Sequence, residues 1–315
     1  MPDLFLVIGG AGFIGSHIVE RLVHNGYRVR VIDSLITGKR ENIEPFLSEI
    51  EFIEGDIRDL ELLREAMDSV DYVLHQAALP SVPRSIKDPL ATNAANVDGT
   101  LNVLVAARDT GVKRVVYASS SSIYGDSPVL PKKETMTPEP RSPYAVSKLA
   151  GELYSQVFHR VYGLETVCLR YFNVFGPRQD PSSHYSGVVA KFIVSLLEGK
   201  APTVFGDGEQ SRDFTYVENV VEANLLATRA KRVSGEVFNI AYGEQLTVKG
   251  LVRLLGDILE VPSGLEAKYA LARPGDVRHS LADISKAMTF LGYEPAVNVK
   301  EGFKRTVEWY RSHRP

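Results

Sequence analysis

A glycine-rich turn directly after a short apolar run places the strongest constraint on how this chain can fold. Residues 4–8 read Leu-Phe-Leu-Val-Ile, and residues 9–15 read Gly-Gly-Ala-Gly-Phe-Ile-Gly. From Gly10 the spacing is G-x-G-x-x-G, between a strand-like run and a helix-like one, which is typical of a dinucleotide-binding unit. The glycines let the backbone approach a pyrophosphate, and the start of the helix offers it free N–H groups. The alternative is a tight turn without a ligand, which the flanking strand and helix disfavour.

An acidic residue at the right distance supports the same interpretation. Asp33 ends the next apolar run, 28–33, eighteen residues after Gly15. A carboxylate there accepts hydrogen bonds from ribose hydroxyls and repels a 2′-phosphate, so NAD is predicted over NADP. Lys39 and Arg40 lie close in sequence and soften that preference.

Short apolar runs alternate with helix-length segments through the first half of the chain. The predicted strands are 4–8, 28–33, 51–56, 72–77, 114–119 and 165–171, and the predicted helices are 13–25, 60–68, 93–110 and 144–161. Gly26, Gly111 and Gly163 stand just past three of these helices, where a left-handed cap favours glycine. The alternation predicts an α/β fold with a Rossmann-type, doubly wound parallel sheet.

The texture of the chain changes near residue 172. Five prolines fall within 126–143, which predicts a loop, and a second loop at 176–187 precedes a helix near 188–198. We predict an NAD-binding Rossmann domain over 1–172 and a smaller mixed α/β substrate-binding domain over 173–315. Some segments of the second domain are expected to return to the first.

Composition excludes several classes of function. The 315 residues carry a net charge of -3 without a like-charge block, so neither a nucleic acid nor a membrane surface is predicted as a partner. The apolar stretches are far shorter than the ~20 residues that span a bilayer. Cys168 is the one cysteine and the seven histidines are scattered, so no disulfide and no metal are predicted. We expect a soluble, cytoplasmic protein.

A tyrosine and a lysine lie four residues apart at the start of a predicted helix. This spacing puts the Tyr144 phenol and the Lys148 ammonium on one face, where the ammonium favours the phenolate. The serine run 119–122 ends the preceding strand, at the sheet edge where ligands bind, and its hydroxyls can share a substrate proton. A Tyr/Lys pair alone is more often packing plus a solvated charge. Beside a dinucleotide turn, we predict that it is catalytic.

Together these motifs resemble the extended short-chain dehydrogenase/reductase family, and within it the NAD-dependent epimerases and dehydratases, above all the UDP-sugar 4-epimerases. The resemblance covers nearly the whole chain. Further motifs that carry it are Gly55-Asp56, the run 96–100, Tyr124-Gly125, the run 169–176, Arg212-Asp213-Phe214 and Arg273-Pro274-Gly275-Asp276. The resemblance implies NAD as cofactor, a UDP-sugar as substrate and a homodimer.

The resemblance also implies site residues. The implied cofactor-binding residues are Gly9, Gly12, Phe13, Ile14, Asp33, Ser34, Gly38, Lys39, Asp56, Ile57, Gln76, Ala77, Ala78, Asn96, Tyr144, Lys148, Tyr171 and Val174. The implied substrate-binding residues are Ser81, Ser120, Ser121, Ser122, Tyr144, Asn173, Gly187, Val188, Phe205, Arg212, Phe214, Arg273, Asp276 and Ser280. Arg212 and Arg273 would clamp the diphosphate, Asp276 the uridine ribose, and Phe205 would pack on the uracil.

The residues after Ser120 separate the members of the family. Dehydratases carry an Asp-Glu pair there and decarboxylases commonly a glutamate, whereas this chain has Ser121 and Ser122. Elimination would therefore lack its general acid and base. The prediction is 4-epimerisation through a 4-keto sugar. The implied catalytic residues are Tyr144 with Lys148, and Ser120 and Ser121, whose hydroxyls would hydrogen-bond the reacting oxygen.

One position bears on the substrate. Ser280, four residues after Asp276, matches the family position that faces the sugar 2-substituent, where a tyrosine admits only plain hexoses. The segment 79–85 also resembles the subgroup of the family that prefers UDP-GlcNAc. Together, Ser280 and this segment favour an enzyme that interconverts UDP-GlcNAc and UDP-GalNAc, and also UDP-Glc and UDP-Gal. The alternative for Ser280 is that its small side chain indicates space in the pocket without indicating a preferred substrate. The alternatives for the function are a UDP-glucose or UDP-glucuronate 4-epimerase and a non-catalytic NAD-binding regulatory protein. Such a regulatory protein usually lacks the Tyr/Lys pair.

The helix predicted at 144–161 carries an apolar face. Its members are Leu149, Leu153, Val157 and Val161. The family commonly dimerises through this helix and the one at 93–110, but burial against the chain's own second domain would need the same pattern. Both interpretations remain open.

Overall fold

A seven-stranded parallel sheet forms the centre of the computed structural model, which describes residues 2–181, 187–261, 266–271 and 277–313. The strand order is β11-β6-β5-β4-β1-β2-β3, and every neighbouring pair is parallel. The strands are β1 (Leu4–Ile8), β2 (Arg28–Asp33), β3 (Ile50–Glu54), β4 (Tyr72–His75), β5 (Arg114–Ser120), β6 (Glu165–Tyr171) and β11 (Glu236–Ile240). The Rossmann-type doubly wound sheet is confirmed.

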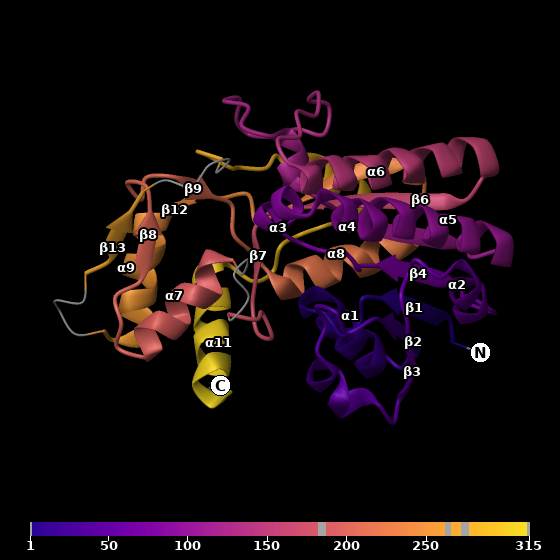
Figure 1. The fold of residues 1–315 in the computed structure, drawn as a ribbon, viewed down its shortest axis with the longest axis horizontal. Coiled ribbons are helices and arrows are strands. Elements are labelled where there is room, and N and C mark those ends of the chain that lie inside the picture. The colour runs from indigo at the N-terminus through magenta and orange to yellow at the C-terminus, as the bar shows by residue number, and fades with distance from the viewer. Residues whose placement is uncertain (1, 182–186, 262–265, 272–276, 314–315) are drawn as a thin grey trace.

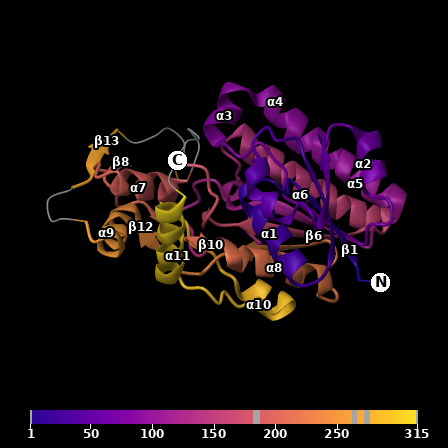
Figure 2. The ribbon, with the colours of Figure 1, turned by 90° about the horizontal axis from the view of Figure 1, so that it is seen from below.

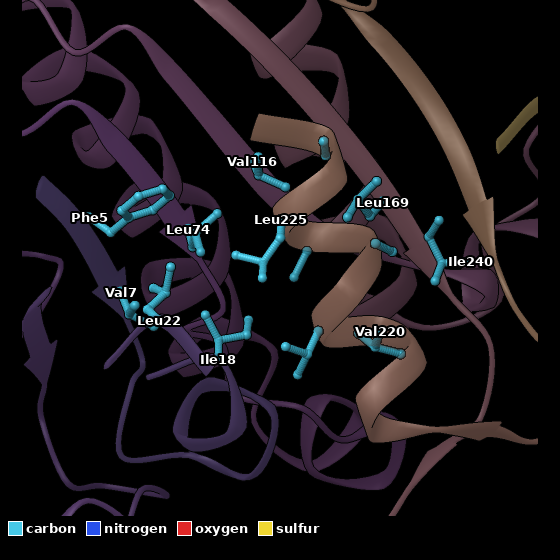
Figure 3. Packing of buried hydrophobic residues seen from close by; sticks show 14 of the residues in the cluster. Phe5, Val7, Ile18, Leu22, Leu74, Val116, Leu169, Val220, Leu225 and Ile240 are labelled. Carbon is cyan, nitrogen blue, oxygen red and sulfur yellow. The ribbon is translucent and has the colours of Figure 1, made fainter. Parts of the chain in front are cut away.

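Helices cover both faces of this sheet (Figure 1, Figure 2). On one face lie α1 (Phe13–His24) and α8 (Val217–Arg229), and on the other α2 (Leu60–Ala66), α5 (Gly99–Thr110) and α6 (Pro143–Tyr162). Alternate residues of one strand therefore enter different cores. Phe5 and Val7 join the cluster with α1 and α8, part of which Figure 3 shows, while Leu6 joins the other. A strand buried on both faces has to be apolar throughout.

Most predicted elements lie where the sequence placed them, and the differences are local. The helix predicted at 93–110 is interrupted: α4 (Pro89–Asn93) is followed by a π turn, η3 (Ala94–Asp98), and then by α5. The Asp88 side chain caps α4 by accepting from the Ala91 N–H, so the helical stretch begins earlier than predicted. Strands β3 and β4 end earlier than predicted, and the residues after them form loops at the carboxyl edge of the sheet.

A smaller unit lies beside that edge and is built mainly from the second half of the chain (Figure 1). Its helices are α7 (Val188–Leu197), α9 (Val248–Leu259) and α11 (Val299–Ser312). Its short strands pair as β7 (Val174–Phe175) with β10 (Thr215–Tyr216), β8 (Thr203–Phe205) with β13 (Lys268–Ala270), and β9 (Ser211–Arg212) with β12 (Leu246–Thr247). Strand β11, helix α8 and α10 (Ser285–Leu291), although later than residue 172, pack with the large sheet. The remaining helix α3 (Val82–Lys87) follows β4.

None of the helices in the described ranges is long and apolar enough to cross a membrane.

Candidate active site

The glycine turn leads from β1 into α1 and is shaped as a cradle. Gly9 has a φ of +81°, and a Cβ there would come within 2.6 Å of the Ala77 nitrogen. Gly12 is the N-cap of α1 and provides no side-chain cap, so N–H groups of the first helical turn stay available to an anion. A Cβ on Gly15 would collide with the Gly9 carbonyl oxygen. The turn therefore needs glycine at these places, and it fits the pyrophosphate of a dinucleotide.

Asp33 ends β2 beside this cradle. One carboxylate oxygen accepts from the Ala11 N–H at 2.9 Å and the other from the Leu35 N–H at 2.8 Å. A Cβ on Gly38 would lie 2.7 Å from both oxygens, so the loop closes tightly over the carboxylate. Burial raises the pKa of Asp33, and its backbone hydrogen bonds oppose that rise. The Asp33 carboxylate is therefore held where it can accept a hydrogen bond from a ribose hydroxyl.

The two nearby cations are directed elsewhere. The Lys39 ammonium lies 3.5 Å from a Glu41 oxygen and 3.8 Å from an Asp180 oxygen. The Arg40 guanidinium lies over the Phe52 ring, 5.1 Å from its centroid. Both have partners within the protein, so Asp33 retains the acidic selectivity that favours NAD over NADP.

The other residues predicted to bind the cofactor follow the strands at the same edge. Ser34 comes after β2, Asp56 and Ile57 after β3, and Gln76, Ala77 and Ala78 after β4. The Arg58 guanidinium beside Asp56 lowers the pKa of that carboxyl. In a doubly wound sheet, this carboxyl edge is where a dinucleotide lies.

A cavity of about 510 Å³ opens between the sheet edge and the smaller unit. Eleven residues predicted for the site line it: Phe13, Ile14, Ser120, Ser121, Ser122, Tyr144, Tyr171, Asn173, Val174, Arg212 and Ser280. They come from α1, β5 and the turn that follows it, α6, β6, β7, β9 and the segment after residue 277, which lie far apart in sequence. No Asp or Glu is among the described residues that line this cavity.

Tyr144 and Lys148 both lie in the first turns of α6, which Ser142 caps by accepting from the Ala145 N–H at 3.1 Å. Burial raises the pKa of Tyr144, and hydrogen bonding to Ser120 lowers it. We expected Lys148 to bring that pKa down, but its Nζ instead donates to the Ala118 carbonyl oxygen at 2.8 Å. Burial lowers the pKa of Lys148 to about 7. In this structure Ser120 is the group that hydrogen-bonds the phenol, and Lys148 is held by the Ala118 carbonyl oxygen.

The Lys148 side chain is buried behind Tyr144, between α6 and β5. Its ammonium lies over the Tyr117 ring, 5.0 Å from the centroid, a cation–π contact. His75 packs against Tyr117 at 5.5 Å between ring centroids, and its Nε2 lies 3.0 Å from the Thr100 hydroxyl. Burial lowers the pKa of His75 to about 3, so this ring is neutral and does not compete with the ammonium.

A buried ion pair joins α6 to the sheet just below the serine run. Arg170 on β6 contacts the Glu152 carboxylate of α6, with Nε 3.0 Å from one oxygen, and both side chains are under 5% exposed. The Ser119 hydroxyl donates to Glu152 at 2.8 Å, and Arg170 donates to the Tyr124 hydroxyl at 2.7 Å. The network fixes the helix that carries Tyr144 against the strand that carries the serines.

Two residues predicted to touch the cofactor have structural partners. Asn96 accepts from the Leu79 N–H at 2.8 Å and donates to the Ser147 hydroxyl at 3.0 Å, so it ties the loop after β4 to α6. The Tyr171 hydroxyl donates to Gln76 at 3.2 Å, and both groups contact Asn224 of α8. Asn96 acts mainly as a positioning residue, whereas Tyr171 also lines the cavity.

Asp213 holds the substrate side of the cavity together. Its carboxylate accepts from the Gly243 N–H at 3.1 Å and from the Ala282 N–H at 3.1 Å, although burial raises its pKa to about 7. Its backbone oxygen accepts from the Asn173 side-chain amide at 3.3 Å. Arg212 and the segment with Ser280 are thereby fixed on one wall.

Two predicted substrate contacts, Phe214 and Ser81, are corrected by the structure. Phe214 is 2% exposed and lies edge-on to Phe175 and Phe303 in the core of the smaller unit, so its ring cannot meet a ligand. The Ser81 hydroxyl caps α3 by accepting from the Arg84 N–H, and the cavity wall is formed by its neighbours Pro80 and Val82 instead.

Gly187, Val188 and Phe205 are not among the residues that line the cavity. Gly187 is the N-cap of α7, which begins at Val188, and a Cβ there would be 3.0 Å from the side chain of Gln179. Phe205 ends β8. Arg273 and Asp276 lie outside the described residues.

Sequence reasoning missed three polar side chains of the cavity: Lys132, Gln179 and His279. His279 Nδ1 lies 2.8 Å from the Ser211 hydroxyl, and Gln179 donates to the Val174 carbonyl oxygen at 3.3 Å. Lys132 is one of two consecutive lysines in a proline-rich loop, where no periodicity distinguishes it from Lys133. Its place depends on a contact with residues near 282, which no local pattern indicates.

No group of three or more His, Cys, Asp or Glu in the part of the chain that the structure describes could hold a metal ion.

A family model described as the NAD dependent epimerase/dehydratase family matches residues 5–241. The chain belongs to that family. The resemblance and the predicted cofactor, NAD, are thus confirmed, and the cradle and Asp33 are the features of this family member that fit the dinucleotide.

Named relatives of this epimerase/dehydratase family member cover nearly its full length. A protein of Methanocaldococcus jannaschii called a putative UDP-glucose 4-epimerase is 41% identical over 98% of this chain and 99% of that protein. The structure of UDP-N-acetylglucosamine 4-epimerase from Methanobrevibacter ruminantium, in complex with UDP-N-acetylmuramic acid, has a TM-score of 0.94 and 43% identity and covers 99% of both chains. The structure of UDP-glucuronic acid 4-epimerase from Bacillus cereus, with UDP-glucuronic acid and NAD, has a TM-score of 0.91 and 34% identity and covers 98% of this chain and 99% of that one.

Proposed function

We propose that this protein is an NAD-dependent UDP-sugar 4-epimerase that interconverts UDP-GlcNAc and UDP-GalNAc, and UDP-Glc and UDP-Gal, through a 4-keto sugar. The observation that carries the reaction type is the lining of the cavity. Tyr144 and the hydroxyls of Ser120 and Ser121 meet there, and no carboxylate is among the described lining residues. Without a carboxylic acid to expel a hydroxyl, the site is suited to inversion at one carbon rather than elimination.

The residues of the chain divide the work of the reaction. The Tyr144 oxygen, which Ser120 hydrogen-bonds in this structure, removes the proton of the sugar 4-hydroxyl and later returns it. The Ser120 hydroxyl also hydrogen-bonds the reacting sugar oxygen. NAD, held by the cradle and Asp33, supplies the hydride acceptor at the sugar carbon. Arg212 holds the diphosphate, which suits its forked guanidinium, and lets the sugar present either face.

The N-acetylated substrate is favoured by the wall that carries Ser280. Its small side chain lines the cavity beside Val277 and His279, and its backbone N–H donates to the Ser211 carbonyl oxygen at 3.1 Å. The relative named as a UDP-N-acetylglucosamine 4-epimerase supports this choice. Relatives named for UDP-glucose and UDP-glucuronic acid make these sugars the alternatives.

Product analysis tests the function directly. The purified protein is incubated in turn with UDP-GlcNAc, UDP-glucose and UDP-glucuronate, and the 4-epimers are separated and quantified. We expect the highest kcat/KM on UDP-GlcNAc. A higher kcat/KM on UDP-glucuronate would replace the proposed substrate, and bound NAD without any turnover would favour a regulatory protein.

The role of Ser280 is tested by enlarging it. Ser280→Tyr adds an aromatic ring to the wall, so we expect kcat/KM on UDP-GlcNAc to fall about tenfold or more relative to that on UDP-glucose. Ser280→Ala, which keeps the volume, is the matched control. Undiminished turnover of UDP-GlcNAc by the tyrosine variant would show that this wall does not face the 2-substituent.

We also propose a cytoplasmic homodimer. Leu153, Val157 and Val161 on α6 are each more than 40% exposed and follow one another at helical spacing. Leu149 packs inward against Ile123 and its neighbours, so only part of the predicted apolar face is left for a partner. A continuous exposed apolar stripe is typical of an interface, and a second copy of the chain would cover it.

A further inference from the structure

Lys132 brings a cation to a cavity that is otherwise lined by apolar side chains, hydroxyls and amides together with Arg212 and His279. It lies in the loop between the serine run and α6, and it is 2% exposed. The same cavity is lined by Tyr144 and Ser280. A lysine so deeply shielded is uncommon, because its charge loses its hydration.

The backbone of Lys132 is held beside the Ser280 wall. Its N–H donates to the Leu281 carbonyl oxygen at 2.7 Å, and its carbonyl oxygen accepts from the Asp283 N–H at 2.8 Å. An isolated parallel bridge pairs it with Ala282. These bonds place Lys132 two residues along from Ser280 on the neighbouring strand of chain, so both belong to one wall.

The ammonium is incompletely satisfied by the protein. It donates to the Ser127 carbonyl oxygen, which is uncharged. Asp126 and Glu139 are near enough to favour its charged form, while burial disfavours it. Within residues 2–181, 187–261, 266–271 and 277–313, the Asp126 and Glu139 carboxylates act on it through space and not as hydrogen-bonded partners. Because an ammonium has three donors and accepts nothing, it selects a strong hydrogen-bond acceptor.

We propose, on the basis of the proposed function, that Lys132 is a specificity-determining residue whose ammonium donates to a carbonyl-type oxygen on the hexose. Two sugars offer such an oxygen: the acetamido carbonyl of an N-acetylhexosamine and the carboxylate of a uronate. A plain hexose offers only hydroxyls at the same positions. Lys132 and Ser280 thus act together, Ser280 by leaving space and Lys132 by supplying the donor.

Lys132→Met tests this with a side chain of similar length and no charge. We expect kcat/KM on the preferred carbonyl-bearing substrate to fall roughly 10- to 100-fold, and on UDP-glucose by less than about threefold. Lys133→Met is the matched control: its side chain is 60% exposed, pairs with Asp283 at 3.7 Å and faces outside this cavity, so all three substrates should be unaffected. Thermal melting and the content of bound NAD check that each variant is folded.

The arms of the experiment separate the two oxygen sources and the two proposals. A loss confined to UDP-GlcNAc identifies the acetamido oxygen, and a loss confined to UDP-glucuronate identifies the carboxylate. Either result supports Lys132, whereas the proposed substrate is decided separately by the kcat/KM values of the native protein. If no substrate turns over, Kd values of the three UDP-sugars from calorimetry carry the same comparison. Equal losses on all three, or none, would overturn the role of Lys132.

Two further variants cover a folding failure of Lys132→Met. Lys132→Arg keeps the charge and should keep the substrate preference within about threefold. Lys132→Gln keeps a donor but loses the charge, and should reduce the preference. An arginine variant that loses the preference as fully as the glutamine variant would count against a charged donor at this place.

Discussion

At the scale of single residues, burial sets the chemistry of the reactive face. Lys148 is buried and Tyr144 is half-buried at the cavity wall, and desolvation pushes each toward its neutral form. Ser120 counteracts this for Tyr144, and the Ala118 carbonyl oxygen orients Lys148. The phenol is thus poised to exchange a proton with a hydroxyl placed between it and Ser120.

Removing the Tyr144 hydroxyl separates chemistry from binding. We expect Tyr144→Phe to lower kcat roughly 10²- to 10⁴-fold while UDP still binds, because the phenol acts on the proton and not on the diphosphate. Tyr154→Phe, on the exposed side of the same helix, is the control and should keep full turnover. Turnover in Tyr144→Phe within tenfold of the native protein would exclude the base role; single-turnover assays and UDP calorimetry measure both.

Lys148 makes the stability of the fold depend on pH. Burial lowers its pKa from 10.5 to about 7, so between pH 7 and 10.5 the folded protein binds fewer protons than the unfolded chain. The contribution of Lys148 to the free energy of unfolding therefore rises with pH through that window. This contribution is lost as the pH falls through 7. Urea unfolding at pH 7 and pH 9 should show a gain roughly 1–2 kcal/mol larger in the native protein than in Lys148→Met. A gain in the free energy of unfolding of equal size in both proteins would mean that the pKa of Lys148 is not lowered in the folded protein.

At the scale of elements, one ion pair decides how α6 meets the sheet. Glu152 of α6 receives bonds from Arg170 of β6 and Ser119 of β5, so a helix and two strands share a single carboxylate. The pair is buried, and removing one partner would leave the other charge unpaired. The register of the reactive residues on α6 against the serine run depends on this carboxylate.

Replacing one partner of the Glu152–Arg170 pair is expected to lower the free energy of unfolding more than replacing both. Glu152→Gln should lower the free energy of unfolding by about 3–5 kcal/mol, because the Arg170 charge is left buried without its counter-charge. The double variant Glu152→Leu with Arg170→Met removes both charges and should recover at least half of that loss. Urea unfolding of the three proteins measures it; a double variant less stable than Glu152→Gln would contradict the desolvation argument.

At the scale of the whole molecule, the sheet and the smaller unit enclose the cavity between them. The glycine cradle belongs to the first and Arg212 and Ser280 to the second, so cofactor and substrate side chains meet only where the two pack. The exposed stripe of Leu153, Val157 and Val161 on α6 belongs to the unit of the large sheet.

Charge on that stripe tests the proposed homodimer. Leu153→Asp with Val157→Asp should shift the protein from dimer to monomer in sedimentation velocity, because two carboxylates would be desolvated at the interface. Met288→Asp, an exposed apolar position on α10, is the control and should leave the mass unchanged. A native protein that sediments as a monomer would refute the homodimer.

The sequence by itself was sufficient for features whose cause is local. Only a few neighbouring residues determine the glycine turn, the place of Asp33 and the Tyr144–Lys148 spacing. The continuous apolar strands likewise predict that the sheet is buried on both faces. Tertiary structure alone decided the environment of those groups. Lys148 donates to the Ala118 carbonyl oxygen, Phe214 lies in a core with Phe303, and Lys132 lines the cavity beside the segment near residue 282. Each outcome depends on packing between segments that are 30 to 149 residues apart, which no local pattern indicates.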